Sequence, residues 1–278
     1  MNTRVGYSSC PNDIFVFEAL ISGLVSSPGH SFETIIEDVE ALNLRARSRD
    51  LDVTKISFHA FGHLRESHVL LDSGSALGRG CGPLLIARES LEHNQLRDCR
   101  IAIPGELTTA TLLLRLFAPE ARNFKILVFD QIIPAVAEGL VDAGLIIHES
   151  RFTYQEHGLA QLVDLGEWWE KTSGQAIPLG GIIADRRLGE DRIREFDQLL
   201  RSSILFAHAH PEKIWDAIRH HAQEIDNEVI RKHIDLYVND YTTSLGNEGR
   251  EAIRVLFERA EEVGILKPTR TKDFMLPR

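Results

Sequence analysis

A repeated local pattern constrains this chain most strongly: a short apolar run ends in a polar turn, and a helical segment follows. Residues 4–8 lead through the turn 9–13 into an apolar segment from Ile14, and residues 100–103 lead through another turn into residues 111–117. Apolar runs this short are typical of strands buried in a sheet. The order of strands and helices therefore predicts an α/β fold, in which ligands bind beyond the carboxyl ends of the strands.

Residues 140–154 contain the strongest candidate for chemistry. The apolar run 145–147 lies between Gly144 and His148, which predicts a buried parallel strand that ends at His148. Histidine is suited to proton transfer near neutral pH because its ordinary pKa is about 6.5. A histidine that only hydrogen-bonds to a loop would give the same pattern, so His148 is a candidate general base.

The turn after the first predicted strand offers polar groups at the same kind of edge. Ser9 and Asn12 lie in this turn, and either Asn12 or Asp13 is expected to cap the following helix. The strand–turn–helix order would place these side chains where a ligand binds. A cap without any ligand contact is an equally good interpretation of these residues.

Two further segments are candidates for substrate binding. Lys55 and Ser57 lie two residues apart in a predicted strand and should face the same way, toward an anion or a carbonyl group. Thr108, Thr109 and Ala110 precede an apolar helix, whose first N–H groups and partial positive charge suit a carboxylate or a phosphate. Simple helix capping would look the same in the sequence.

Composition limits the classes of partner. The net charge of -10 argues against a nucleic-acid-binding face, which would be basic. Three cysteines at unrelated spacings (Cys10, Cys81 and Cys99) fit neither a disulfide framework nor a zinc motif. The start of the chain lacks the apolar core of a secretory signal, and no run approaches the roughly 20 apolar residues of a membrane span. We therefore expect a cytoplasmic protein without a membrane or nucleic-acid partner.

The order of the predicted elements indicates two lobes. Residues 1–99 are expected to form the first part of lobe one, residues 100–178 lobe two, and residues 179–278 a return strand and helices that complete lobe one. The chain would cross between lobes near residues 83–88 and 179–186. The predicted site is then the cleft between the lobes, a common position for ligands.

Seven motifs also identify a family. SSCPND at 8–13, DVEALN at 38–43, DVTKISFHAF at 52–61 and SGSALGRGCGPLL at 73–85 resemble the 1,4-dihydroxy-6-naphthoate synthase family. PGELTTA at 104–110, AGLIIHE at 143–149 and GQAIPLGG at 174–181 extend the resemblance. This family serves the futalosine route to menaquinone, and the motifs occur in order over most of the first 190 residues.

The resemblance implies a two-lobed, periplasmic-binding-protein-like (type II) fold and a lyase that needs no metal or organic cofactor. Its small-molecule substrate would be cyclic dehypoxanthinylfutalosine, cleaved to 1,4-dihydroxy-6-naphthoate and a ribose-derived fragment. By motif, the proton acceptor falls on His148, and substrate contacts fall on Lys55-Ile56-Ser57 and Thr109-Ala110. Ser9, Asn12 and Thr108 are further candidates to line the cleft.

Two other functions fit the same features. A chorismate dehydratase-like enzyme of the same pathway would share the cleft but use a different catalytic arrangement. A solute-binding protein would capture a small carboxylate without turnover, although the absence of a signal segment argues against it. The sequence does not determine the oligomeric state, and a homodimer is one alternative.

Overall fold

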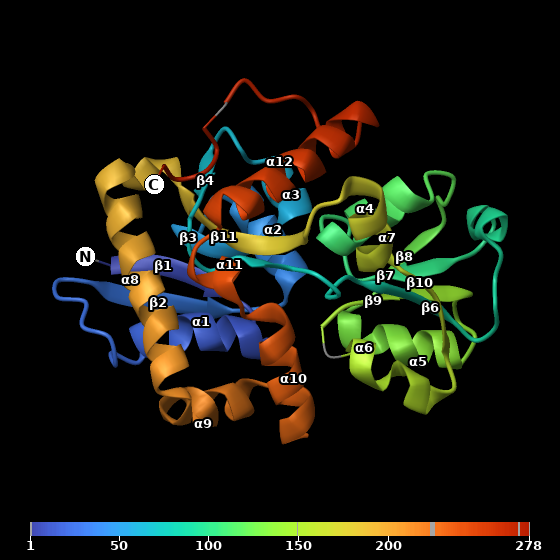
Figure 1. The fold of residues 1–278 in the computed structure, drawn as a ribbon, viewed down its shortest axis with the longest axis horizontal. Helices are drawn as coiled ribbons and strands as arrows, with labels where there is room; N and C mark the ends of the chain where they lie inside the picture. The colour runs from blue at the N-terminus through green and yellow to red at the C-terminus, as the bar shows by residue number, and fades with distance from the viewer. Residues whose placement is uncertain (1, 149, 223–225, 272, 278) are drawn as a thin grey trace.

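The computed structural model describes residues 2–148, 150–222, 226–271 and 273–277, and it consists of two lobes, each built around a sheet (Figure 1). Within these residues the first sheet contains β1 (Asn2–Tyr7), β2 (Ser31–Ile36), β3 (Val53–Ser57), β4 (His68–Leu70), β5 (Ala76–Gly78) and β11 (Ile177–Asp185). The second contains β6 (Leu84–Ala87), β7 (Ile101–Ile103), β8 (Phe124–Ile126), β9 (Ala143–Ile146) and β10 (Ala160–Asp164).

Helices flank both sheets. The helices that precede β11 are α1 (Pro11–Ile21), α2 (Val39–Ser48), α3 (Phe58–Gly62), α4 (Thr109–Phe117), α5 (Ile132–Ala137), α6 (Ser150–Thr153) and α7 (Leu165–Ser173). The C-terminal helices are α8 (Glu190–Ala209), α9 (Pro211–His221), α10 (Asn227–Tyr237), α11 (Asp240–Thr243) and α12 (Gly246–Glu262). Short 3-10 helices are η1 (His93–Arg97), η2 (Phe129–Gln131), η3 (Tyr154–His157) and η4 (Arg186–Leu188).

Both sheets mix parallel and antiparallel strands. In the first, β1 is parallel to β2 and β3, whereas β11 runs antiparallel to β3, β4 and β5. In the second, β9 is parallel to β7 but antiparallel to β6. The predicted parallel strand before His148 is therefore parallel to one neighbour only, because β6 arrives from the first lobe in the opposite direction.

The chain passes between the sheets at two places. It leaves the first sheet after β5 and enters the second at Leu84, and it returns at Ile177 with β11. The sequence-based division assigned residues up to 99 to lobe one, so this boundary needs a correction: β6 pairs with β9 and β10 in the second sheet. An apolar run alone does not identify the sheet that it joins.

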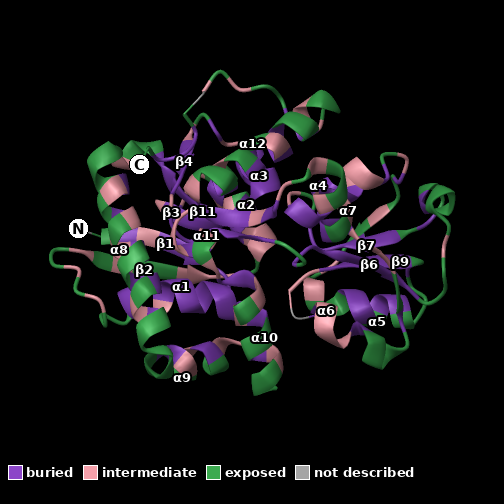
Figure 2. Ribbon diagram, in the orientation of Figure 1, coloured by how far each residue is buried: buried purple, intermediate pink, exposed green. Residues whose placement is uncertain are grey.

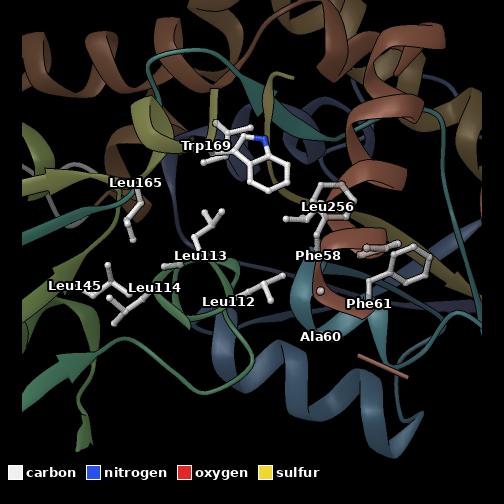
Figure 3. Packing of buried hydrophobic residues seen from close by; sticks show 14 of the residues in the cluster. Phe58, Ala60, Phe61, Leu112, Leu113, Leu114, Leu145, Leu165, Trp169 and Leu256 are labelled. Atoms are coloured by element: carbon white, nitrogen blue, oxygen red, sulfur yellow. The ribbon is translucent and has the colours of Figure 1, made fainter. Parts of the chain in front are cut away.

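A continuous apolar cluster joins the two lobes on one side. Figure 3 shows Phe58 and Phe61 of α3 close to Leu112 and Leu113 of α4, with Trp169 of α7 packed beside them. Trp169 is buried, and its Nε1–H donates to Ala176 O at 3.2 Å. This tryptophan is therefore part of the core, which links the lobes through side chains rather than through the crossing strands alone.

The C-terminal helices complete the first lobe. Helix α1 packs against α8, α9 and α10, and the buried residues of this layer form a second apolar cluster. Figure 2 shows the exposed outer faces of α8, α9 and α10 and the buried central strands. In the described part of the chain, no helix combines the length and the apolar composition required to cross a membrane.

Candidate active site

A cavity lies where the carboxyl edges of the two sheets meet, and it encloses about 610 Å³ of space, its mouth included. Strands β1 and β3 are parallel and end at Tyr7 and Ser57, while β7 and β9 are parallel and end at Ile103 and Ile146. The lining contains Asn12, Val39, Lys55, Ile56, Ser57, Ala76, Cys81, Pro83, Thr108, Thr109, Ala110, Ile147, His148, Leu179, Gly180 and Tyr237.

The structure brings nearly all of the candidate residues to this cavity. His148, Lys55-Ile56-Ser57, Thr108-Thr109-Ala110 and Asn12 are in its wall, whereas Ser9 is not among the lining residues. The four segments come from both lobes. Their roles in chemistry remain predictions.

His148 is separated from the end of β9 by Ile147 and has a backbone φ of 60°, in the left-handed region that side-chain-bearing residues rarely adopt. Its half-buried ring packs edge-on against Phe129, with 5.1 Å between the centroids, and stacks on His233 at 6.2 Å. Its Nδ1 lies 2.9 Å from Cys10 Sγ. Backbone strain of this kind persists where the surrounding structure holds a side chain in a required position.

Cys10 reaches His148 because it is the N-cap residue of α1. Pro11 occupies the first helical position, which suits its fixed φ and its missing N–H. The expectation that Asn12 or Asp13 caps this helix is therefore wrong. Both residues are buried in its first turn, and their side chains make tertiary contacts instead.

Asp13 and Lys55 form a buried ion pair in the floor of the site. Lys55 Nζ lies 2.6 Å from Asp13 Oδ1, and the two side chains are 8% and 2% exposed. Ser8 donates to Asp13 Oδ2 from its hydroxyl at 2.6 Å and from its backbone N–H at 3.1 Å. The Lys55 charge is thus already compensated inside the protein, which the sequence did not indicate.

Asn12 connects this ion pair to His233 of α10. Asn12 Nδ2 donates to Asp13 Oδ1 at 3.0 Å, so its Oδ1 faces His233 Nε2 at 3.1 Å. Because the amide oxygen is an acceptor, His233 Nε2 carries the proton and Nδ1 keeps its lone pair. Burial lowers the pKa of His233 well below its usual value, so this ring is neutral.

Ser57 belongs to a second network that reaches the other lobe. Asn43 donates to Ser57 Oγ at 3.2 Å and to Glu40 Oε2 at 2.9 Å, while the Ser57 N–H donates to Asn43 Oδ1 at 2.9 Å. Glu40 Oε1 accepts the N–H of Leu107 at 3.0 Å. Burial raises the pKa of Glu40, although these donors oppose the shift. The network joins α2 to the turn before α4.

The two threonines at the start of α4 use their hydroxyls within the protein. Thr108 caps the helix and accepts the Thr111 N–H at 3.2 Å, the capping alternative that the sequence left open, and Thr109 Oγ1 donates to Leu179 O at 2.5 Å. The N–H groups of a first helical turn have no intrahelical acceptor. Because both hydroxyls are engaged, the donors that this segment presents are backbone N–H groups of the first turn, including those of Thr109 and Ala110.

Glycine and aromatic residues shape the remaining wall. Gly180 of β11 lies opposite Ser57, and a Cβ there would come within 2.7 Å of Ile56 O, so only glycine allows this close approach. The Tyr237 ring lies 4.6 Å from that of His233, and burial raises its pKa. Burial raises the pKa of Cys81 to about 12, so this residue is a neutral thiol in the wall.

Comparison with known proteins identifies the family. A family described as "Menaquinone biosynthesis" matches residues 3–262 of the chain. This chain belongs to that family. A Thermus thermophilus protein named 1,4-dihydroxy-6-naphtoate synthase is 48% identical over 266 residues, covering 96% of both chains. A Streptomyces coelicolor protein of the same name is 43% identical over 269 residues, covering 95% of this chain and 94% of that protein. The family resemblance in the motifs is confirmed.

Solved structures support the fold. A protein from Archaeoglobus fulgidus superposes with a TM-score of 0.89 at 35% identity, covering 95% of this chain and 98% of the other. An alkanesulfonate-binding protein from Xanthomonas axonopodis superposes with a TM-score of 0.74 at 14% identity, over 99% and 97% of the two chains. The expected periplasmic-binding-protein-like fold with two lobes is confirmed.

Sequence reasoning missed several residues of the site. Cys10 and Asp13 lie within the SSCPND motif, so the motif itself was the available signal. His233 and Tyr237 lie on a helix whose sequence is that of an ordinary amphipathic surface helix. Only tertiary packing brings Tyr237 to the cavity wall and His233 next to His148 and Asn12 behind it. Cys10, His148 and His233 each offer one ligand atom, and these atoms lie within 4.8 Å of one another, so the described residues include a group able to hold a metal ion.

Proposed function

We propose that this protein is a lyase that converts cyclic dehypoxanthinylfutalosine to 1,4-dihydroxy-6-naphthoate and a ribose-derived fragment, with His148 as the general base. The main support is one observation: a half-buried imidazole and a helix N-terminus line the same cavity, in a chain that is 48% identical to a named synthase. The cavity accommodates a small molecule, and the second lobe would supply both the base and the anion-binding N–H groups, while Lys55 and Ser57 line the cavity from the first lobe.

The geometry suggests how each group would act. A carboxylate of the substrate would accept the N–H groups at Thr109 and Ala110, with Ser57 close by in the same wall. The reacting carbon would then lie next to His148, which lines the same cavity. Removal of a proton by a positioned imidazole is the step that would begin the fragmentation.

The base role also determines the tautomer of His148. A neutral imidazole carries one proton, and its other nitrogen holds the lone pair. If Nε2 accepts the substrate proton, Nδ1–H must point at Cys10 Sγ, 2.9 Å away, with the sulfur as a weak acceptor. Cys10 would thereby orient the ring. The ammonium group of Lys55 is paired with Asp13, so it would not act on the imidazole as an uncompensated charge.

The proposal includes a location in the cytoplasm. None of the cysteines in the described residues is joined in a disulfide, which fits a reducing compartment. The two-lobed fold by itself gives no information on location, because it supports both binding proteins and enzymes.

The test is to incubate the purified protein with cyclic dehypoxanthinylfutalosine and to follow naphthoate release by chromatography. His148→Ala should fold normally and lose about 10²–10⁴-fold in turnover, the usual effect of removing a general base. His157→Ala is the matched control, because His157 is an exposed histidine of the same lobe and should keep full activity.

Other outcomes would support the alternatives. Near-normal turnover of His148→Ala would remove His148 from the mechanism. Tight binding without release would indicate a small-carboxylate-binding protein, and conversion of chorismate instead would indicate the dehydratase-like enzyme.

A further inference from the structure

We infer that Cys10, His148 and His233 form a binding site for one thiophilic divalent cation, with Zn²⁺ as its representative, and that an occupied site inhibits the enzyme. The binding half of this inference rests on the structure alone. The inhibition half rests on the proposed role of His148 as the base.

The three donor atoms are close to the arrangement that zinc requires. They lie within 4.8 Å of one another, and the contact between Cys10 Sγ and His148 Nδ1 is 2.9 Å. In a tetrahedral site with Zn–N near 2.05 Å and Zn–S near 2.3 Å, neighbouring ligand atoms are about 3.4–3.6 Å apart. Shifts of roughly 1 Å or less, within the range of side-chain rotations, would complete the three-ligand set.

The donor types favour particular cations. One sulfur and two imidazole nitrogens suit Zn²⁺, Co²⁺ and copper, whereas Mg²⁺ and Ca²⁺ prefer oxygen ligands. The cation would replace the thiol proton of Cys10, so one proton is released for each ion bound. Cys10 is at the N-terminus of α1, where the partial positive charge of an eleven-residue helix favours the resulting thiolate.

An outer layer of hydrogen bonds already orients one ligand. Asn12 accepts the Nε2–H of His233 and is itself held by Asp13, which fixes the lone pair on His233 Nδ1. Metal-binding histidines commonly have their second nitrogen held in this way, and the loss of such a partner costs about 10–100-fold in metal affinity. The site therefore has a preformed outer shell on its most buried ligand.

The position of the site explains the expected inhibition. Cys10, His148 and His233 supply three ligands, and a water molecule from the cavity that His148 lines would supply the fourth. A cation held by His148 occupies a lone pair of the imidazole or blocks the approach of the substrate to the ring. A neutral imidazole that binds the metal through Nδ1 carries its proton on Nε2, so Nε2 has no lone pair to accept the substrate proton and occupied molecules would lack a general base.

The binding test is a titration of the purified full-length protein with Co²⁺, followed by its absorption spectrum, and with Zn²⁺ by calorimetry. We expect one equivalent of each ion, a thiolate-to-cobalt charge-transfer band, and no heat of binding with Mg²⁺. Cys10→Ser should abolish the charge-transfer band. It should also lower the affinity for Zn²⁺ by more than roughly 10–100-fold, the usual cost of losing an outer-shell partner. His233→Gln, which keeps a donor for Asn12, should retain the band but bind Zn²⁺ more weakly.

A matched control separates this site from other thiols. Cys99→Ser removes a buried cysteine outside the cavity lining and should leave the stoichiometry and the cobalt spectrum unchanged. A thermal melt of each variant checks that the fold is kept. A cobalt spectrum without a sulfur band, or a band that survives Cys10→Ser, would overturn the site.

The activity test is separate from the binding test. With turnover established, Zn²⁺ should inhibit at the concentrations at which calorimetry shows binding, and a chelator should restore the rate. Full activity at saturating Zn²⁺, or stimulation by it, would overturn the inhibition while leaving the binding site in place. If the chain shows no turnover at all, the proposed function fails and the cobalt titration still decides the site.

Discussion

The buried ion pair between Asp13 and Lys55 gives the sharpest prediction on stability. Asp13→Asn removes the negative charge that contacts Lys55 Nζ at 2.6 Å, in a place where the lysine side chain is 8% exposed. The substitution also replaces an oxygen that accepts from Ser8 with an amide of mixed polarity. The ammonium group would remain buried without its counter-charge.

The expected magnitude is large. Removing one partner of a buried pair typically costs about 3–5 kcal/mol, because an uncompensated charge stays out of water. Domains are stable by about 5–15 kcal/mol, so the variant should still fold at neutral pH but with a much lower urea midpoint. Lys55→Met should cost a similar amount, since it leaves the carboxylate buried.

The double variant separates the charge effect from the loss of shape. If the cost arises from an unpaired charge, Asp13→Asn with Lys55→Met should be more stable than the sum of the two single changes by about 2 kcal/mol or more. Urea unfolding followed by tryptophan fluorescence gives all four free energies of unfolding. Asp98→Asn is the control, because Asp98 has a side chain that is 86% exposed and should change stability by less than about 0.5 kcal/mol.

Two results would refute this reasoning. Single variants that lose less than about 1 kcal/mol would mean that water or rearrangement compensates the remaining charge. Additive effects in the double variant would mean that the two side chains contribute independently, and that the 2.6 Å contact carries no coupling.

Further predictions concern the helix cap, a close backbone contact and two buried histidines. Thr108→Ala should lower stability by about 1 kcal/mol in urea unfolding, and an unchanged midpoint would show that the cap bond is dispensable. Gly82→Ala places a Cβ against the backbone of Gly166, so it should lower the melting temperature by an amount equivalent to about 1–3 kcal/mol; a normal melt would contradict this. Burial lowers the pKa of His59 to about 3 and that of His68 to about 4. Below about pH 6.5 the unfolded chain protonates these two histidines, whereas the folded chain keeps them neutral. The free energy of unfolding is therefore highest above about pH 6.5 and decreases as the pH falls toward about 4. Each should cost about 2 kcal/mol by about pH 5, and His59→Gln should reduce the pH dependence of the urea midpoint.

Much of the fold follows from local patterns in the sequence. The short apolar runs became strands, and the helices expected after the return strand are present as α8, α9, α10 and α12, with the short α11 between the last two. The periodicity of strands and helices depends on residues close together in the chain, so these elements can be predicted without tertiary information. The assignment of β6 to the second sheet could not be predicted, because a buried strand carries no local mark of its partners.

Some residues of the candidate site could likewise be predicted from local patterns, and others could not. His148 and the segments at Lys55 and Thr109 were predictable because each lies where a strand ends or a helix begins, and such ends carry polar side chains. The N-cap of α1 was wrongly predicted from propensity. Because Pro11 is the first helical residue, Cys10 is the N-cap, and the side chain of Asp13 forms an ion pair with Lys55 instead of capping the helix.

The sequence by itself determined the α/β class, the family, and the polar residues at the edges of the strands, since these depend on residue type and spacing. Only the tertiary structure decided that Lys55 is paired with Asp13, and that Cys10 and His233 lie beside His148. Contacts of this kind join residues far apart in the chain, and they exist only when the packing of α1 and α10 brings them to one edge. The physical reason is that a local pattern encodes which face of an element is buried, whereas the neighbour on that face is chosen by the packing of the whole fold.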